Sequence, residues 1–121
     1  MKVILLPGMD GTGALLSPLV DELEGLGHSA TVIRYPHDAP QSYAELIDDL
    51  VLPSLPTDEP FVLLAESFSG PIALAVAQRE LPSLVGLALV VTFAEPPESI
   101  LLSLTKLLPV TWILSAPIPC W

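Results

Sequence analysis

The stretch from residue 61 to 80 joins an apolar run to a helical pattern through a very tight turn. The turn reads Ala-Glu-Ser-Phe-Ser-Gly, with Ser67 at the bend and the small residues Ala65 and Ser69 two positions before and after it. Only small side chains fit where a strand folds back so sharply into a helix. Such a turn lifts the central hydroxyl above the sheet, at the N-terminus of the next helix. The pattern predicts a nucleophile elbow at residues 65–70, with an ordinary strand-to-helix turn as the alternative.

The rest of the chain repeats this alternation of strand and helix patterns. Four short apolar runs without a polar face are separated by stretches of helical character. Runs of this kind are typical of parallel strands buried between two layers of helices. The sequence therefore predicts an α/β fold, a parallel sheet with helices on both faces. The expected strands are residues 2–6, 30–35, 61–65 and 85–93, and the expected helices begin after Gly13, after Ser42 and near Phe68, the last ending at Glu80.

Apolar residues at helical spacing define the face that each of the first two helices should bury. Ser42 and Glu45 have the spacing of a capping box, which predicts the start of the second helix. The stripe of the first helix comprises Leu15, Leu16, Leu19, Val20, Leu23 and Leu26, and that of the second comprises Leu46, Ile47, Leu50 and Val51.

A glycine-rich loop, Gly8–Gly13, follows the first expected strand. The carboxyl ends of parallel strands meet at one edge of the sheet, and ligands bind at that edge in folds of this kind. The loop and Ser67 both follow strands directly, so both should lie there. The sequence therefore predicts a site built from these two turns.

The composition excludes several classes of partner. The net charge is −10 with only four Lys and Arg, so no basic surface is available for nucleic-acid phosphates or anionic lipids. The longest apolar stretch, residues 84–94, has the length of a strand and is too short for a membrane span. The single cysteine, Cys120, cannot form an internal disulfide and lies far from both histidines in the sequence. We expect a cytoplasmic protein with no metal, no cofactor and no nucleic-acid partner.

The character of the sequence changes near residue 97. Residues 1–97 carry the strand and helix patterns, whereas residues 98–121 are apolar without a clear period. An apolar segment of this kind has to bury itself against something. We expect an α/β core over 1–97, followed by a lid-like or dimerisation segment over 98–121. A homo-oligomer formed through the edge strand and this segment is the expected assembly.

Four motifs together resemble the α/β-hydrolase superfamily, in particular bacterial carboxylesterases of the type that includes pimeloyl-carrier-protein methyl esterases. The resemblance covers residues 1 to about 97, which looks like the first half of a hydrolase. It implies a partial or minimal α/β-hydrolase fold with Ser67 as nucleophile. The motifs are Leu5-Leu6-Pro7-Gly8-Met9-Asp10-Gly11-Thr12-Gly13, Arg34-Tyr35-Pro36, Ser42-Tyr43-Ala44-Glu45-Leu46 and Ala65-Glu66-Ser67-Phe68-Ser69-Gly70-Pro71.

The same resemblance implies which backbone groups would form an oxyanion hole. In that family one N–H comes from the residue after the Pro-Gly pair, which is Met9 here. The second comes from the residue after the nucleophile, which is Phe68. Two preorganised donors stabilise the negative oxygen of a tetrahedral intermediate, each by roughly 3 kcal/mol.

The sequence departs from the family pattern after Ser67. Hydrolases of this family carry an acid and then a histidine after the nucleophile, but no histidine follows Ser67 here. A serine hydroxyl needs a base to accept its proton, so the chain is either truncated or has found another base.

Candidates for the missing acid and base are few. His37 follows the second expected strand at the correct edge and is a candidate base, with Asp38 beside it as a candidate acid; an exposed loop histidine is the alternative. The first strand should separate His37 from Ser67. Glu95 follows the fourth strand and is a second candidate acid. Three further groups have less specific expectations: Asp10 as another possible acid, Glu66 as an orienting neighbour of the serine, and His28 as a structural residue at the opposite end of the sheet.

Three functions compete at this stage. The first is a serine hydrolase, a carboxylesterase that cleaves small ester or thioester substrates through an acyl-enzyme on Ser67. The second is a non-catalytic half-domain that self-associates. The third is dinucleotide binding, suggested by Gly11-Thr12-Gly13, but a third glycine is missing and Arg34 ends the second strand where an acid is usual.

Overall fold

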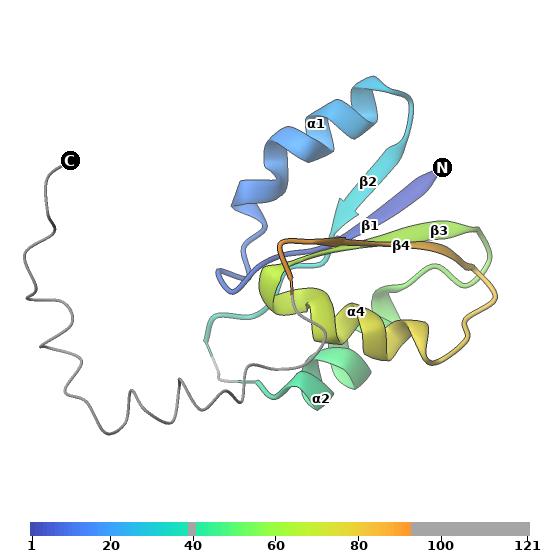
Figure 1. Cartoon of the computed structure of the whole chain (residues 1–121). Coiled ribbons are helices and arrows are strands. Elements are labelled where there is room, and N and C mark those ends of the chain that lie inside the picture. Colours follow the sequence, from blue (N-terminus) through green and yellow to red (C-terminus); the bar gives the residue numbers. More distant parts are fainter. Residues whose placement is uncertain (39–40, 93–121) are drawn as a thin grey trace, which may run out of the picture.

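A computed structural model describes residues 1–38 and 41–92. They form one parallel sheet of four strands, with helices on both of its faces (Figure 1). The predicted α/β class is therefore confirmed. The predicted segment 98–121 lies outside the described residues. The strands are β1 (Lys2–Leu6), β2 (Ser29–Val32), β3 (Phe61–Glu66) and β4 (Leu84–Val90), in the order β2-β1-β3-β4.

The helices divide between the two faces of this sheet. Helix α1 (Ser17–Gly25) covers one face, and α4 (Gly70–Ala77) covers the other together with the segment that begins at α2 (Figure 1). Over the described ranges, no helix combines the length and apolar character needed to cross a membrane. The remaining helical turns are η1 (Ala14–Leu16), α2 (Tyr43–Glu45), the π-helical turn η2 (Leu46–Val51), α3 (Leu52–Ser54) and the 3-10 turn η3 (Ser67–Ser69).

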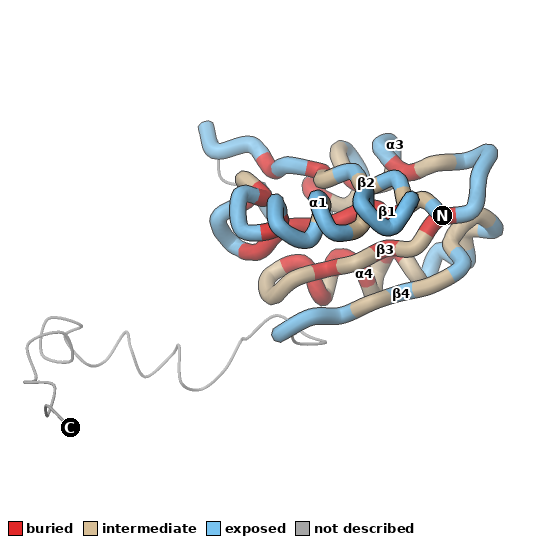
Figure 2. The backbone as a smooth tube through the Cα atoms, turned by 90° about the horizontal axis from the view of Figure 1, so that it is seen from above, coloured by how far each residue is buried: buried red, intermediate tan, exposed pale blue. Residues whose placement is uncertain are grey.

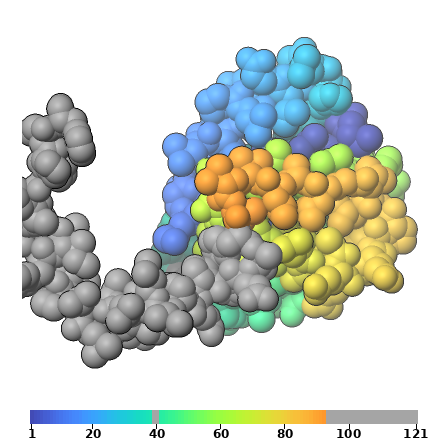
Figure 3. Space-filling model, viewed as in Figure 1, coloured from blue at the N-terminus to red at the C-terminus, as the bar shows by residue number. Residues whose placement is uncertain are grey.

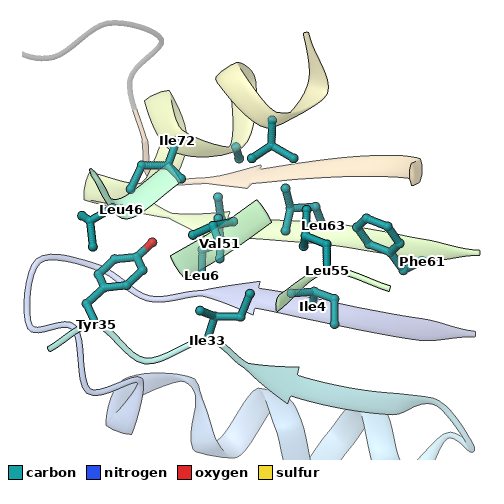
Figure 4. Packing of buried hydrophobic residues seen from close by; sticks show 13 residues of the cluster. Ile4, Leu6, Ile33, Tyr35, Leu46, Val51, Leu55, Phe61, Leu63 and Ile72 are labelled. Carbon is teal, nitrogen blue, oxygen red and sulfur yellow. The ribbon is translucent and has the colours of Figure 1, made fainter. Parts of the chain in front are cut away.

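Two apolar clusters of unequal size hold these layers together. Alternate residues of a strand point to opposite faces, so Ile4 and Leu6 belong to one cluster and Val3 and Leu5 to the other. The larger cluster has 13 buried residues and lies beneath α4 and η2 (Figure 4). The smaller has three, with α1 packed against it. Figure 4 shows Tyr35 at the end of the larger cluster where the strands finish.

Strand β4 lies at an edge of the sheet and is incompletely covered. None of its residues is buried, although it is apolar along its length (Figure 2). Val85 is 54% exposed, and Val91, just beyond the strand, is 88% exposed. The space-filling view shows β4 in orange along the front of the molecule (Figure 3). Among the described residues, no strand pairs with the outer side of β4, and the strand exposes apolar side chains beside this edge.

Two strands end earlier than predicted, and every other strand boundary lies within one residue of its prediction. The second strand was expected to reach Tyr35, but β2 ends at Val32. The chain bends there toward the first loop, because the Tyr35 N–H donates to the Gly11 carbonyl at 2.9 Å instead of to a neighbouring strand. The fourth strand was expected over 85–93 and is observed over Leu84–Val90, while residue 93 lies outside the described part.

The helices lie where the sequence predicted them, but their bounds and buried faces differ from the prediction. The helix expected over 68–80 begins as the 3-10 turn η3, continues as α4 and ends at Ala77. The stripe predicted for the first helix is partly wrong, since Leu15 and Leu26 are each 73% exposed. Both lie in the turns that flank α1, and Leu19, inside α1, is also exposed at 36%, because no residue of this helix is fully covered by the sheet. The capping box of Ser42 and Glu45 is present as predicted.

The turn that leads into η1 packs against β2, and a substitution at Gly13 tests this contact. Gly13 has φ of +72°, and a Cβ there would lie 2.5 Å from Val32 Cγ1. We expect Gly13→Ala to lower the free energy of unfolding by about 3 kcal/mol, because left-handed strain and overpacking add. Gly27→Ala is the matched control, since Gly27 has φ of +84° with nothing within 4 Å of the added Cβ. It should cost only about 1 kcal/mol. Urea denaturation measures both, and equal losses would contradict the packing of this loop on β2.

Candidate active site

The turn after β3 has the backbone of a strained elbow. Ser67 has φ of 46°, a left-handed conformation that residues other than glycine rarely adopt. The 3-10 turn η3 begins at this residue and α4 follows at Gly70. Ala65 and Ser69 are both fully buried, so larger side chains could not be placed on either side of the bend. Strain at a strand-to-helix turn is also a feature of nucleophile elbows, the turn predicted for residues 65–70.

The first loop lies directly against this elbow. Strands β1 and β3 pair in parallel, with Leu6 beside Ala65, so the next residues of both strands emerge together. A Cβ on Gly8 would lie 3.8 Å from Ser67 Cβ. An added Cβ would thus make an ordinary van der Waals contact, which places the backbone of the first loop directly beside the serine.

The N–H of Met9 belongs to a peptide group whose carbonyl is fixed. The Gly11 N–H donates to the Gly8 carbonyl at 3.0 Å, which closes a turn. The Gly8 carbonyl and the Met9 N–H are two ends of one planar peptide group and point in opposite directions. Fixing the carbonyl therefore fixes the direction of the N–H.

The Phe68 N–H is fixed in the same way. Its peptide group includes the Ser67 carbonyl, which accepts hydrogen bonds from the Gly70 N–H and from the Thr92 hydroxyl. Thr92 follows the end of β4, so three neighbouring strands contribute to the two peptide groups. The structure brings both sequence-predicted oxyanion donors to one sheet edge on anchored peptides.

A hollow of about 190 Å³ opens beside these groups. Met9 and Phe68 both line it, and Met9 is 84% exposed at its mouth. His37 lines the same hollow, whereas Ser67 is not among the lining residues. The other lining residues are Asp10, Gly11, Tyr35, Pro36, Gln41 and Leu46.

Two tyrosines hold the Phe68 side chain on either side. The Tyr43 ring stacks on Phe68 with centroids 4.8 Å apart and planes at 21°. The Tyr35 ring meets it edge-on at 6.2 Å and 67°. The Tyr43 hydroxyl also donates to the Phe68 carbonyl at 3.3 Å. Phe68 is therefore held by both its ring and its backbone.

A buried chain of hydroxyls lies beneath the hollow. The Ser69 hydroxyl donates to the Pro7 carbonyl and is bonded to the Tyr35 hydroxyl. Because a serine has a single hydroxyl proton, Tyr35 must be the donor in the second bond. Burial raises the pKa of Tyr35 to about 12. The sequence did not predict these roles of Ser69 and Tyr35. It predicted only that a small residue is needed at position 69.

The candidate base and acids make no hydrogen bond to Ser67 in the described part of the chain. His37 is exposed and packs near Gly11, since a Cβ on Gly11 would lie 3.5 Å from His37 Cε1. Strand β1 separates β2 from β3, as expected, and no hydrogen bond joins His37 to Ser67 within the described ranges. Asp38 is also exposed and does not line the hollow. Glu95 lies outside the described residues.

The three other polar groups singled out from the sequence have clear positions. The Asp10 carboxylate accepts a hydrogen bond from Thr12. Glu66 lies against the first loop, since its Oε2 would be 3.8 Å from a Cβ on Gly8, and this oxygen is buried without a hydrogen-bond partner. His28 precedes β2, at the end of the sheet opposite to Ser67, as predicted. Among residues 1–38 and 41–92, no group of three His, Cys, Asp or Glu side chains could hold a metal ion.

The hydroxyl chain generates a test by titration. The protein has two tyrosines, Tyr35 and Tyr43, and burial raises the pKa of both. We expect ultraviolet titration of the phenolates to show one tyrosine ionising near pH 12, and Tyr35→Phe to remove that step. Because Tyr35 keeps its proton more tightly when folded, its stabilisation is complete below pH 10 and is lost as the pH rises toward about 12. A step that persists in Tyr35→Phe would contradict its assignment to this residue.

Comparison with known proteins adds no family to this description. No protein-family model matches the chain, and no curated protein matches it significantly.

Proposed function

We propose that the protein is a serine carboxylesterase that cleaves small ester or thioester substrates. The observation that carries the proposal is the left-handed backbone of Ser67 at a strand-to-helix turn, with Gly8 of the neighbouring loop directly against it. A serine held at a cost in backbone energy next to a close-packed glycine loop is typical of a nucleophile.

The chemistry uses the groups at this edge in a fixed order. The Ser67 Oγ attacks the ester carbonyl carbon, and its proton passes to a base. The carbonyl oxygen becomes an oxyanion that the Met9 and Phe68 N–H groups stabilise. The C–O or C–S bond then breaks, and the alcohol or thiol leaves with a proton. Water attacks the acyl-enzyme, which releases the acid and restores the Ser67 hydroxyl.

His37 is the base in this proposal. It lines the hollow together with both oxyanion donors, whereas His28 lies at the far end of the sheet. Movement of the His37 loop toward β3 has to bring the imidazole to the serine, because β1 lies between their strands. Asp38 follows directly in the chain and is the acid that would orient the imidazole.

The hollow indicates the size of the acyl group. A volume of about 190 Å³ suits a short acyl chain, with Phe68, Tyr35 and Leu46 as its apolar lining beside the polar Asp10, His37 and Gln41. The overall charge of −10 disfavours an anionic substrate. Short neutral acyl esters are therefore the expected substrates.

Hydrolysis of p-nitrophenyl acetate and butyrate tests this proposal. We expect Ser67→Ala to abolish turnover, because the nucleophile is lost, and His37→Ala to reduce kcat by roughly 100-fold, because the base is lost. His28→Gln is the matched control and should keep the activity of the parent. The proposal fails if the parent turns over no faster than Ser67→Ala. If His37→Ala is as active as the parent, His37 is not the base, but the role of Ser67 as nucleophile is unaffected.

The open edge favours a second candidate, a non-catalytic domain that self-associates. Strand β4 exposes apolar side chains along an edge whose backbone groups can pair with another strand. Edge-to-edge pairing of two copies about a two-fold axis would extend the sheet across a dimer. The candidate requires no chemistry at Ser67.

Light scattering coupled to size exclusion tests this second candidate. We expect the parent to elute as a dimer, and Leu89→Lys on β4 to elute as a monomer, because a charge at a paired edge opposes burial. Leu26→Lys is the control, since Leu26 is more exposed than Leu89 and follows α1 rather than lying on β4. A monomeric parent would rule out self-association, as would a Leu89→Lys dimer of unchanged stability.

A further inference from the structure

We propose that Ser69 is a positioning residue that sets the spacing of the two oxyanion donors by linking the elbow to the first loop. The inference rests on the proposed esterase function. Ser69 occupies the place of the second glycine in the usual elbow pattern, and a glycine there would have no side chain to make such a link.

The two donors are carried by separate segments of the chain. Met9 belongs to the loop after β1, and Phe68 belongs to η3 after β3. The two strands are hydrogen-bonded only as far as the pair Leu6 and Ala65. Beyond that pair, something else has to hold the loop at a fixed distance from the elbow.

The Ser69 hydroxyl supplies this connection. It lies one residue after Phe68 and donates to the Pro7 carbonyl, two residues before Met9. Ser69 is fully buried, so water does not compete for the bond. The elbow and the first loop are thereby joined by a side chain only one residue away from one of the two donors.

Tyr35 completes the link from a third segment. Its hydroxyl donates to Ser69 Oγ, which directs the single serine proton toward Pro7. Its N–H donates to the Gly11 carbonyl at 2.9 Å, in the same loop that carries Met9. Tyr35 is anchored in the larger cluster, so the loop is tied to the rigid part of the molecule.

This arrangement has a consequence specific to the transition state. A shift of the loop by a fraction of an ångström leaves substrate binding in the hollow almost unchanged, but misaligns the Met9 N–H with an oxygen that becomes charged only during reaction. Loss of the Ser69 hydroxyl should therefore reduce kcat and leave KM nearly unchanged.

The test compares kcat, KM and inhibition by a short trifluoromethyl ketone, whose serine adduct carries an oxyanion. In Ser69→Ala we expect kcat to fall about tenfold, inhibitor affinity to fall by the same factor and KM to stay within about twofold, since donors are misplaced and not removed. Ser69→Cys keeps the shape with a weaker donor and should lie between the parent and Ser69→Ala. Tyr35→Phe keeps the bond to Pro7 and should show a smaller loss.

Ser83→Ala is the matched control, because Ser83 also links two segments by a hydroxyl-to-carbonyl bond, to Thr57 at 3.0 Å, near the opposite end of the sheet. It should change thermal stability without changing kcat or inhibitor affinity. Should Ser69→Ala not fold, Ser69→Cys decides. The inference is overturned if the folded Ser69 variants match the parent, or if Ser83→Ala loses as much kcat. A parent no more active than Ser67→Ala overturns the proposed function, and the inference with it.

Discussion

The parallel pairing of β1 with β3 is the constraint on which the candidate site depends. Because Leu6 lies beside Ala65, the two chains leave the sheet at the same level and in the same direction. The loop that follows one strand therefore lies against the turn that follows the other. Gly8 lies beside the serine, since a Cβ on it would be 3.8 Å from Ser67 Cβ. A different register would move the loop away from the serine without changing the fold class.

The turns at this edge are held mainly by hydrogen bonds, and the larger apolar cluster lies beneath them. The peptide groups that carry the Met9 and Phe68 N–H donors have their carbonyls occupied by the Gly11 N–H and the Thr92 hydroxyl. Beneath them the Tyr35 side chain joins the apolar cluster to the polar chain that ends at Pro7. The candidate site therefore combines a rigid support with N–H groups whose directions are fixed by the fold itself.

Much of this arrangement could be predicted from local sequence. The alternation of apolar runs and helical stretches predicted the sheet, and the small residues around Ser67 predicted the sharp turn. Partners that depend on distant residues could not be predicted, because nothing near Ser69 indicates that Tyr35, 34 positions earlier, lies beside it. The first helix shows the opposite failure: its period predicted a buried stripe, but Leu15, Leu19 and Leu26 are exposed and no residue of α1 is buried.

The unequal clusters on the two faces imply that the molecule does not open uniformly. Helix α1 is fastened by the cluster of three buried residues, whereas the opposite layer rests on thirteen. The least costly partial unfolding is therefore detachment of α1, and amide exchange in α1 should be faster than in α4. The link from Ser69 to Pro7 approaches the first loop from the other layer. The first loop therefore keeps this anchor through fluctuations that release the helix next to it in the chain.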